Sequence, residues 1–356
     1  MKPFEGRRIL ITGGTGSLGK VLIRRLLAGE MGLPAKLIVF SRDEAKQHFM
    51  RVEYQNDSPA PTDEIIYHNF ERLLEFRIGD VREFSSIAAA LRDADFVINA
   101  AALKQVPTCE YFPYEAVRTN IAGAENIVRA IQEHRLPIET VVGVSTDKAC
   151  KPVNTMGMTK AIQERIFVQA NMRSPNTRFV CVRYGNVLAS RGSVIPLFHE
   201  QIRKGGPVTI TTTDMTRFLL TLDEAVDTVI AAINTANPGE TYVPRAKAAL
   251  ITHVATALIG RRPIEQAVVG IRPGEKIHEI MVSEDEIYRT VERGRWYAIL
   301  PMLPELSGPE RPTRVLTREY SSMHDVMSLE ETAELLEARG LMPEETSAFQ
   351  GVELLR

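Results

Sequence analysis

Short apolar runs alternate with longer amphipathic segments over the first half of the chain. The runs are rich in Val, Ile, Leu and Phe, which is typical of strands buried in a sheet. We predict strands at Arg8–Thr12, Lys36–Ser41, Leu74–Gly79, Phe96–Ala100, Thr140–Ser145 and Arg178–Val182. Apolar residues at helical spacing predict helices at Leu18–Leu27, Ser85–Leu91, Tyr114–Glu133 and Thr155–Asn171. Strands that alternate with helices imply right-handed crossovers, and therefore an α/β fold with a doubly wound parallel sheet.

The pattern becomes irregular after Arg183, where Gly, Pro and Thr are frequent. We predict short strands at Val208–Thr211, Thr241–Val243 and Glu265–Val269, and helices at Ile195–Lys204, Leu222–Asn234 and Ile251–Leu258. A last helix is expected at Ser328–Arg339, with a capping box of Ser328 and Glu331 at its start and Gly340 after its end. An insertion that opens at Ser58–Pro61 is expected to continue as a helix to about Leu74.

These patterns divide the chain into two parts. Residues 1–183 form the doubly wound domain, and residues 184–356 form mainly a smaller α/β lobe. Some strands and helices of the lobe are expected to return to the first domain, and the chain is expected to end in a helical tail.

Composition narrows the range of partners. The chain has 356 residues with 43 Lys and Arg against 45 Asp and Glu, so its net charge of −2 gives no electrostatic reason to bind nucleic acid or an anionic membrane. No apolar stretch approaches the roughly 20 residues that a membrane span needs. Cys109, Cys150 and Cys181 form no CxxC pair, which argues against both a disulfide framework and a metal site. We expect reduced thiols in a cytoplasmic protein.

A glycine-rich turn follows the first predicted strand. Gly13, Gly16 and Gly19 have the GxxGxxG spacing within Gly13-Gly14-Thr15-Gly16-Ser17-Leu18-Gly19, directly before a predicted helix. Glycine permits the tight turn and the close approach of a pyrophosphate, and the helix N-terminus offers free N–H groups to it. The position between strand and helix is what this motif requires, so we predict a dinucleotide site that includes Thr15, Ser17 and Leu18.

The ends of the next strands indicate which dinucleotide binds. An Asp or Glu after the second strand would accept the ribose 2′-hydroxyl of NAD, whereas this chain has Ser41 and Arg42, which suit the 2′-phosphate of NADP. Asp43 follows at once and keeps NAD open as an alternative. Asp80-Val81 is placed to bracket adenine, and the small side chains from Ala100 leave room for the nicotinamide half.

Seven motifs together carry a family resemblance. They are TGGTGSLG, GDVRE, AAALKQVP, VSTDKACKPVNTMGMTK, VRYGNVLASRGSVIP, MTRF and IRPGEK. In this order, from about Arg8 to Met281, the chain resembles the UDP-N-acetylglucosamine 4,6-dehydratases (inverting) of bacterial capsule, O-antigen and flagellin-sugar synthesis, in the extended short-chain dehydrogenase/reductase superfamily. The insertion near Pro59–Leu74 and the chain beyond about Ser283 are covered less securely.

The resemblance implies a lyase that needs one acid and one base near adjacent sugar carbons. NADP⁺ takes a hydride from C4 and returns it to C6 after C5 loses a proton and C6 its hydroxyl. By resemblance Asp147 is the acid for the C6 hydroxyl, Lys148 the base at C5, and Thr146 a hydrogen-bond partner of the C4 oxygen. An amine base needs a lowered pKa, which we expect from burial or from proximity to Lys160.

Met156 and Lys160 are one helical turn apart, at the positions of the superfamily's Tyr-x-x-x-Lys pair. The chain therefore resembles a methionine variant of the motif. Lys160 keeps its implied role at the nicotinamide ribose, but methionine cannot accept a proton. Two explanations remain open. Either Asp147, Thr146 or a water chain to Lys160 takes the C4 proton, or the chain has lost catalysis. Tyr184 is a phenol that could replace the missing tyrosine, but a structural role is favoured for it.

The resemblance also implies further contacts. Lys104 lies between cofactor and sugar, Val144, Ser145 and the strip from Val187 to Arg191 line the cofactor, and Asn186, Val194 and Thr216 contact substrate. Arg272 and Glu275 are implied contacts of the diphosphate and ribose. Arg217 is open between a phosphate contact and a structural ion pair. We read His199 and His278 as surface or packing residues and Asn120 as a bridge to backbone.

The predicted function is NADP-dependent dehydration of UDP-N-acetylglucosamine, with inversion at C5, by a homo-oligomer between dimer and hexamer. The helix Thr155–Asn171 is one interface candidate. A retaining 4,6-dehydratase, a UDP-sugar 4-epimerase and a non-catalytic NADP-binding regulator remain alternatives.

Overall fold

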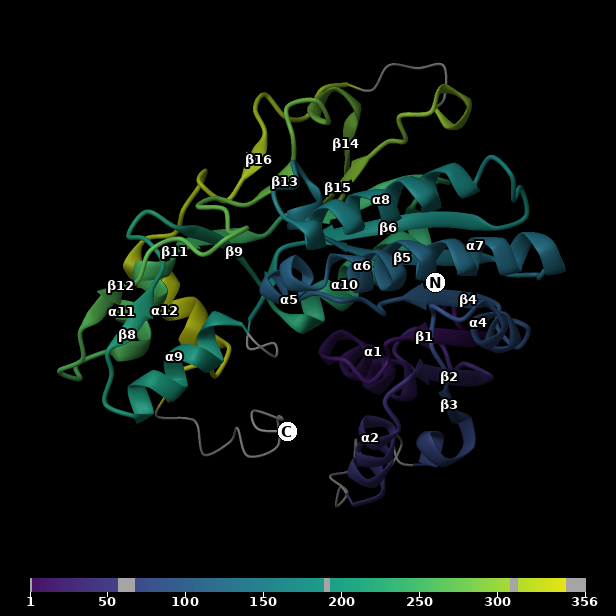
Figure 1. Ribbon diagram of the computed structural model, residues 1–356, viewed down its shortest axis with the longest axis horizontal. Coiled ribbons are helices and arrows are strands. Elements are labelled where there is room, and N and C mark those ends of the chain that lie inside the picture. The colour runs from purple at the N-terminus through teal and green to yellow at the C-terminus, as the bar shows by residue number, and fades with distance from the viewer. Residues whose placement is uncertain (1, 57–67, 189–192, 308–312, 344–356) are drawn as a thin grey trace.

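A nine-stranded sheet runs through the molecule in the computed structural model (Figure 1), which describes residues 2–56, 68–188, 193–307 and 313–343. The strand order is β14-β15-β10-β6-β5-β4-β1-β2-β3. Its central strands are parallel and follow the order 3-2-1-4-5-6, which is that of a doubly wound dinucleotide-binding sheet. The predicted Rossmann-type fold is therefore confirmed.

The six strands predicted in the first half all form. They are β1 (Arg8–Thr12), β2 (Lys36–Ser41), β3 (Leu74–Ile78), β4 (Phe96–Asn99), β5 (Thr140–Thr146) and β6 (Arg178–Tyr184). Alternate residues of one strand face opposite sides of the sheet. Ile9 and Ile11 pack in one core with Leu22 and Val226, whereas Leu10 packs in a second core with Ile127 and Phe167.

Helices cover both faces of the sheet. Those of the first half are α1 (Ser17–Leu27), α2 (Glu44–Asn56), α4 (Phe84–Leu91), α5 (Val106–Tyr111), α6 (Pro113–Ala116), α7 (Gly123–His134) and α8 (Thr155–Ala170). Residues 68–73 are also helical, in agreement with the end of the predicted insertion, whose beginning lies outside the described residues.

The prediction of a single helix at Tyr114–Glu133 is wrong in one respect. A π-helical turn, η1 (Val117–Ala122), separates α6 from α7. The turn carries Asn120, whose amide accepts a hydrogen bond from the Leu103 N–H and donates to the Leu103 carbonyl and the Thr159 hydroxyl. The extra residue in this π-helical turn orients the Asn120 side chain toward Leu103 and Thr159. Apolar periodicity does not reveal such a local change in helix geometry. The expected structural role of Asn120 is confirmed.

The second half builds the lobe and also extends the large sheet. Its elements are β7 (Asn186–Val187), α9 (Val194–Arg203), β8 (Val208–Ile210), β9 (Thr216–Leu220), α10 (Leu222–Thr235), β10 (Thr241–Pro244), β11 (Lys247–Leu250), α11 (Ile251–Ile259), β12 (Gln266–Val268), β13 (Ile280–Val282), β14 (Thr290–Arg293), β15 (Trp296–Ile299), β16 (Tyr320–Ser321) and α12 (Leu329–Ala338). Strands β10, β14 and β15 join the sheet and α10 packs on α1, while α9, α11 and α12 share a separate core at the left of Figure 1. The capping box of Ser328 and Glu331 is confirmed, and Gly340 has a positive φ of 61° after α12.

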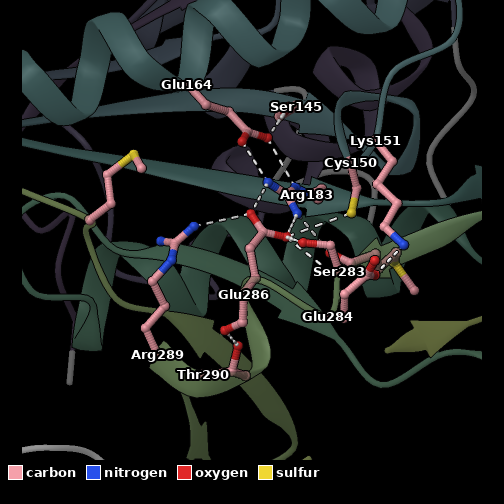
Figure 2. Close-up of polar contacts among 12 residues, drawn as sticks. Ser145, Cys150, Lys151, Glu164, Arg183, Ser283, Glu284, Glu286, Arg289 and Thr290 are labelled. Carbon is pink, nitrogen blue, oxygen red and sulfur yellow. Dashed lines mark hydrogen bonds and ion pairs between the residues drawn. The ribbon is translucent and has the colours of Figure 1, made fainter. Parts of the chain in front are cut away.

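A buried ion cluster ties the two halves together beside the end of β5 (Figure 2). Arg183 of β6 donates to both carboxylate oxygens of Glu164 of α8, at 3.1 and 2.7 Å, and to both of Glu286, at 2.8 and 3.0 Å. It also donates to the Met281 carbonyl at 2.8 Å, and Ser145 donates to Glu164 at 2.5 Å. Because every charge is paired, the second half is held in place next to the strand end that carries Thr146 and Asp147.

Cys109, Cys150 and Cys181 are buried free thiols, as expected for reduced cysteines. Among the residues that the structure describes, no helix has both the length and the apolar character that crossing a membrane would require.

Candidate active site

The glycine turn after β1 is shaped for close backbone approach. Gly13 has a φ of 65°, and a Cβ on it would lie 2.8 Å from the backbone of Ala101. A Cβ on Gly19 would lie 2.3 Å from the carbonyl oxygen of Gly14. Helix α1 begins at Ser17 with no side-chain cap, which leaves its first N–H groups available to an anion. The turn and the helix start therefore fit the pyrophosphate of a dinucleotide.

One cleft of about 660 Å³ runs from this turn across the carboxyl ends of the central strands. A doubly wound sheet presents its ligand site at this edge. Most of the predicted site residues line it: Gly13, Thr15, Gly16, Ser17, Leu18, Gly19, Ala100, Lys104, Val144, Ser145, Thr146, Lys148, Met156, Lys160, Asn186, Val187, Arg272 and Glu275. Ser41, Arg42, Asp80, Val81, Asp147, Val194 and Thr216 are not among the lining residues. Residues 189–191 of the predicted cofactor strip lie outside the described residues.

The residues predicted to bind the adenosine half of the dinucleotide lie at the strand ends beside the glycine turn. The Ser41 hydroxyl lies 3.3 Å from that of Thr15, and Arg42 is largely exposed at 3.9 Å from Asp80. Burial opposes ionisation of Asp80, but hydrogen bonds from Arg82 outweigh it and hold the pKa of Asp80 below its usual value. Asp43 accepts the Lys46 N–H at 3.0 Å and pairs with the Lys46 amine.

The motif residues at the end of β5 form a charged group with a partner from far along the chain. Asp147 and Lys148 begin a short 3₁₀ turn, η2 (Asp147–Ala149). The Lys148 amine lies 3.1 Å from Asp147, 3.2 Å from the Asn186 amide oxygen and 2.9 Å from Glu279. The Thr146 hydroxyl donates to Asp147 at 2.8 Å. Asp147 and Glu279 are fully or almost fully buried, and each keeps one carboxylate oxygen without a partner among the described residues.

These contacts shift the pKa values in opposite directions. Burial raises the pKa of Asp147 above its ordinary value, which makes its carboxyl a weaker acid. Burial opposes charge on Lys148, but Asp147 and Glu279 outweigh it and hold the pKa of Lys148 above its usual value. The expectation of a lowered pKa for Lys148 is therefore wrong, because the fold brings a second carboxylate, that of Glu279, to the amine.

Lys160 has the lowered pKa instead. It is almost wholly buried, and burial lowers its pKa to about 8. Its amine donates to the Gln163 side chain at 2.6 Å, and Gln163 donates to the Val144 carbonyl at 3.2 Å. Lys160 can therefore lose its proton near neutral pH.

Met156 lies one turn before Lys160 and lines the cleft, but its side chain is mostly buried against Cys109 and Ala116. Asn154 caps this helix through the Gly157 N–H at 2.8 Å and donates to the Gly274 carbonyl at 2.7 Å. Tyr184 also lines the cleft, but burial raises the pKa of its phenol above the usual value, which disfavours the phenolate that a base would need.

The far end of the cleft carries the remaining candidates. Glu275 accepts from the Thr211 hydroxyl at 3.4 Å and from the Arg272 N–H at 3.3 Å. Arg217 lines the cleft and donates to the carbonyls of Thr216 and Ile277, so its guanidinium is held by backbone. No ion pair of Arg217 within 4 Å is present in the described part of the chain.

Thr216 is buried, and its hydroxyl contacts His278 and Ser322, both at 2.8 Å, rather than the cleft. The Nε2 of His199 lies 2.8 Å from the Leu341 carbonyl oxygen in the lobe core. The packing roles expected for His199 and His278 are confirmed.

Two charged residues of the cleft, Lys46 and Glu279, were not predicted from the sequence. Glu279 lies three residues after Lys276 of the IRPGEK motif, and an acid so close to a substrate motif was the available signal. Lys46 lies in α2, a helix that was not predicted because its apolar residues are few.

Comparison with known proteins decides the family. The model of a family described as "Polysaccharide biosynthesis protein" matches residues 9–301. The chain belongs to this family. It is 42% identical over 303 residues to a UDP-N-acetylglucosamine 4,6-dehydratase (inverting) of Campylobacter jejuni, with 84% of each chain covered. The resemblance found in the sequence is thereby confirmed.

Other relatives carry a different name. A protein of Rickettsia bellii called UDP-glucose 4-epimerase is 42% identical over 301 residues, with 83% of each chain covered. Among solved structures, Pen from Bacillus thuringiensis is 31% identical with a TM-score of 0.84, covering 95% of this chain and 99% of that one. A dTDP-glucose 4,6-dehydratase from Streptomyces venezuelae, 21% identical with a TM-score of 0.62 over 76% of this chain and 86% of that one, shares the fold.

The low pKa of Lys160 predicts a stability cost at the site. In the folded chain its pKa is about 8, against an ordinary value of 10.5, so folding disfavours the protonated amine. We expect Lys160→Met to raise the free energy of unfolding at pH 7 by about 1–3 kcal/mol, less than the full pKa difference because Gln163 loses its donor. The gain should be complete below about pH 8 and should disappear as the pH approaches 10.5.

Urea denaturation at several pH values measures this gain. Lys204→Met, at an exposed pair with Glu200, is the control and should change little at any pH. A Lys160→Met variant less stable than the wild type at pH 7 would contradict the prediction.

Proposed function

We propose that the chain dehydrates UDP-N-acetylglucosamine to the 4-keto-6-deoxy sugar with inversion at C5, for surface polysaccharide or glycoprotein sugar synthesis. The observation that carries the proposal is the pair of Thr146 and Lys148 at the cleft, both hydrogen-bonded to the buried Asp147, whose pKa burial raises. Elimination across adjacent carbons needs an acid and a base. The relative of Campylobacter jejuni with this named activity supports it.

In the proposal Lys148 acts as the base and Asp147 as the acid of the elimination. Lys148, once deprotonated, takes the C5 proton, and Asp147, which does not line the cleft, gives its proton through the Thr146 hydroxyl to the departing C6 hydroxyl, which leaves as water. A proton from solvent then adds to the opposite face of C5. Thr146 lines the cleft, hydrogen-bonds Asp147 and contacts the C4 oxygen. Because Met156 cannot take the C4 hydroxyl proton, that proton passes to the ionised Asp147, to Thr146 as its own proton moves on to Asp147, or through water to Lys160, whose pKa of about 8 suits a proton acceptor near neutral pH.

The glycine turn, the ends of β5 and β6, and Lys160 would hold a nicotinamide dinucleotide, which supplies the acceptor and donor of hydride when bound. The fit of Gly13 and Gly19 to close backbone approach supports this. We propose NADP rather than NAD because Arg42 is exposed after β2, Lys46 lines the cleft, and the Asp43 carboxylate is already paired with Lys46.

A homo-oligomer is part of the same proposal. Tyr111 of α5, Tyr114 of α6 and Phe112 between these helices are largely exposed, and Met158 and Ile162 are exposed on the adjoining helix α8. A patch of this kind is typical of a surface that another chain covers.

A UDP-sugar 4-epimerase is the second candidate, because the Rickettsia relatives with that name are equally similar. An epimerase performs no elimination, so the chemical outcome at C6 separates the two.

Proton NMR of the purified protein with UDP-N-acetylglucosamine in deuterated water tests the function. We expect a new C6 methyl signal, deuterium at C5, and couplings that show the inverted C5 configuration. Lys148→Met should slow elimination by about 10²–10⁴-fold with cofactor binding unchanged, because it removes the base. Lys151→Met, at a more exposed lysine paired with Glu319, should leave the rate nearly unchanged.

Three outcomes would contradict the proposal. Unchanged C5 configuration in the product would mean a retaining dehydratase, and UDP-N-acetylgalactosamine without a methyl signal would mean an epimerase. Unaltered substrate with the cofactor still bound would exclude dehydration of this sugar nucleotide.

The choice of cofactor is tested by affinity. We expect Arg42→Ala to weaken NADP⁺ binding by about 10- to 100-fold, the effect of one charge-assisted hydrogen bond, and to leave NAD⁺ binding nearly unchanged. Calorimetric titration of both dinucleotides measures this, and a wild-type protein that binds NAD⁺ more tightly would contradict it.

A further inference from the structure

Glu279 is the one carboxylate that reaches the Lys148 amine from outside the end of β5, among the residues that the structure describes. Its Oε1 lies 2.9 Å from the amine, and the residue is 1% exposed while lining the same cleft. The pair spans 131 positions of the sequence, since Glu279 directly precedes β13. A buried ion pair of this kind costs desolvation energy on both sides, so its position at the proposed base calls for an explanation.

The backbone around Glu279 is fixed from two directions. Its N–H donates to the Ser322 hydroxyl at 2.9 Å, and its carbonyl accepts the Ser322 N–H at 2.8 Å. Two residues on, the Met281 carbonyl accepts from Arg183, whose guanidinium is itself bound to Glu164 and Glu286. The side chain of Glu279 is therefore presented to Lys148 by a rigid frame.

The charges around the pair define what Glu279 does. Asp147 of η2 is the other carboxylate at Lys148, and burial raises its pKa above the ordinary value. Arg217 of β9 and Lys276 add positive potential near Glu279; together with Lys148 they outweigh burial and hold the pKa of Glu279 below its usual value. Asn186 of β7 contributes only a neutral amide oxygen. Of the two carboxylates at Lys148, Glu279 is therefore the one whose neighbours favour its ionised form.

We propose that Glu279 is a positioning residue for Lys148: its carboxylate holds the amine at the cleft and sets the pH at which that amine becomes available as a base. This inference rests on the proposed function, because it assumes that Lys148 removes the C5 proton. In the resting protein Lys148 is an ammonium, and its proton must leave to solvent before elimination begins. Removing the negative charge of Glu279 disfavours the ammonium, so the neutral amine becomes available at lower pH.

The pH dependence of elimination tests the proposal. The single-turnover rate of 4-keto-6-deoxy product formation is measured across the pH range for the wild type and for Glu279→Gln. We expect the acidic limb of the profile to move to lower pH by about 1 to 3 pH units, the effect of removing one opposite charge within about 4–6 Å. Glu279→Asp keeps the charge at a longer distance, so its limb should lie between the two.

The control is Glu284→Gln, which removes an exposed acid from the same segment and should leave the profile in place. If Glu279 had a purely structural role, Glu279→Gln would lower the rate by one factor at every pH, and an acidic limb that does not move would overturn the proposal. If Glu279→Gln does not fold, an unmoved limb in Glu279→Asp overturns it equally. Failure of the proposed function is a separate result, because the wild type would then form no 4-keto-6-deoxy product at any pH.

Discussion

The buried guanidinium of Arg183 is the interaction on which the rest of the site depends. It lies on β6, next to the strand that ends in Thr146, and it binds one carboxylate from α8 and one from the second half of the chain. Burial opposes ionisation of Glu286, but Arg183 outweighs it and lowers the pKa of Glu286 to about 2. Breaking such a cluster costs about 3–5 kcal/mol, because the remaining charges are left buried without a partner. The segment that carries Glu279 is therefore held next to Lys148.

The electrostatics of the cleft follow from which buried groups have partners. Asp147 and Lys160 lose more by burial than they gain from neighbours, so the pKa of the acid rises and that of the amine falls. Lys148 has two carboxylates beside it, and its pKa rises despite burial. The pKa values of these two lysines are therefore shifted in opposite directions. The pKa of Lys148, proposed to take the C5 proton, is raised, and that of Lys160, proposed to lie at the nicotinamide side, is lowered. Separation of pKa values within one site is how a fold performs acid and base chemistry at one pH.

The sequence was sufficient for the parallel strands of the sheet because their signals are local. Strands such as Arg8–Thr12 are continuous apolar runs, and the glycine spacing fixes the turn that follows. The π-helical turn at Asn120 was missed because one extra residue hardly changes helical periodicity. Strands β9 and β13 were missed because short, evenly buried strands show no alternation.

The residues of the candidate site also separate into those that a local motif predicts and those that it does not. Asp147, Lys148 and Lys160 follow one another along a motif, whereas Glu279 reaches Lys148 only through the packing of two distant segments. No local pattern in the sequence predicts that contact, and therefore none predicts the raised pKa of Lys148. The positions of Thr216 and Arg217 show the same limit, since both hydroxyl and guanidinium are bound within the protein by partners more than 50 residues away.

The most direct test of the account is a crystal structure of the Lys148→Met protein with NADP⁺ and UDP-N-acetylglucosamine. We expect C5 of the sugar to lie beside the side chain at position 148 and the C6 hydroxyl to lie within about 3–3.5 Å of the Thr146 hydroxyl, close enough for proton transfer. A hexose bound with C5 and C6 turned away from these residues, toward solvent or toward Tyr184, would contradict it.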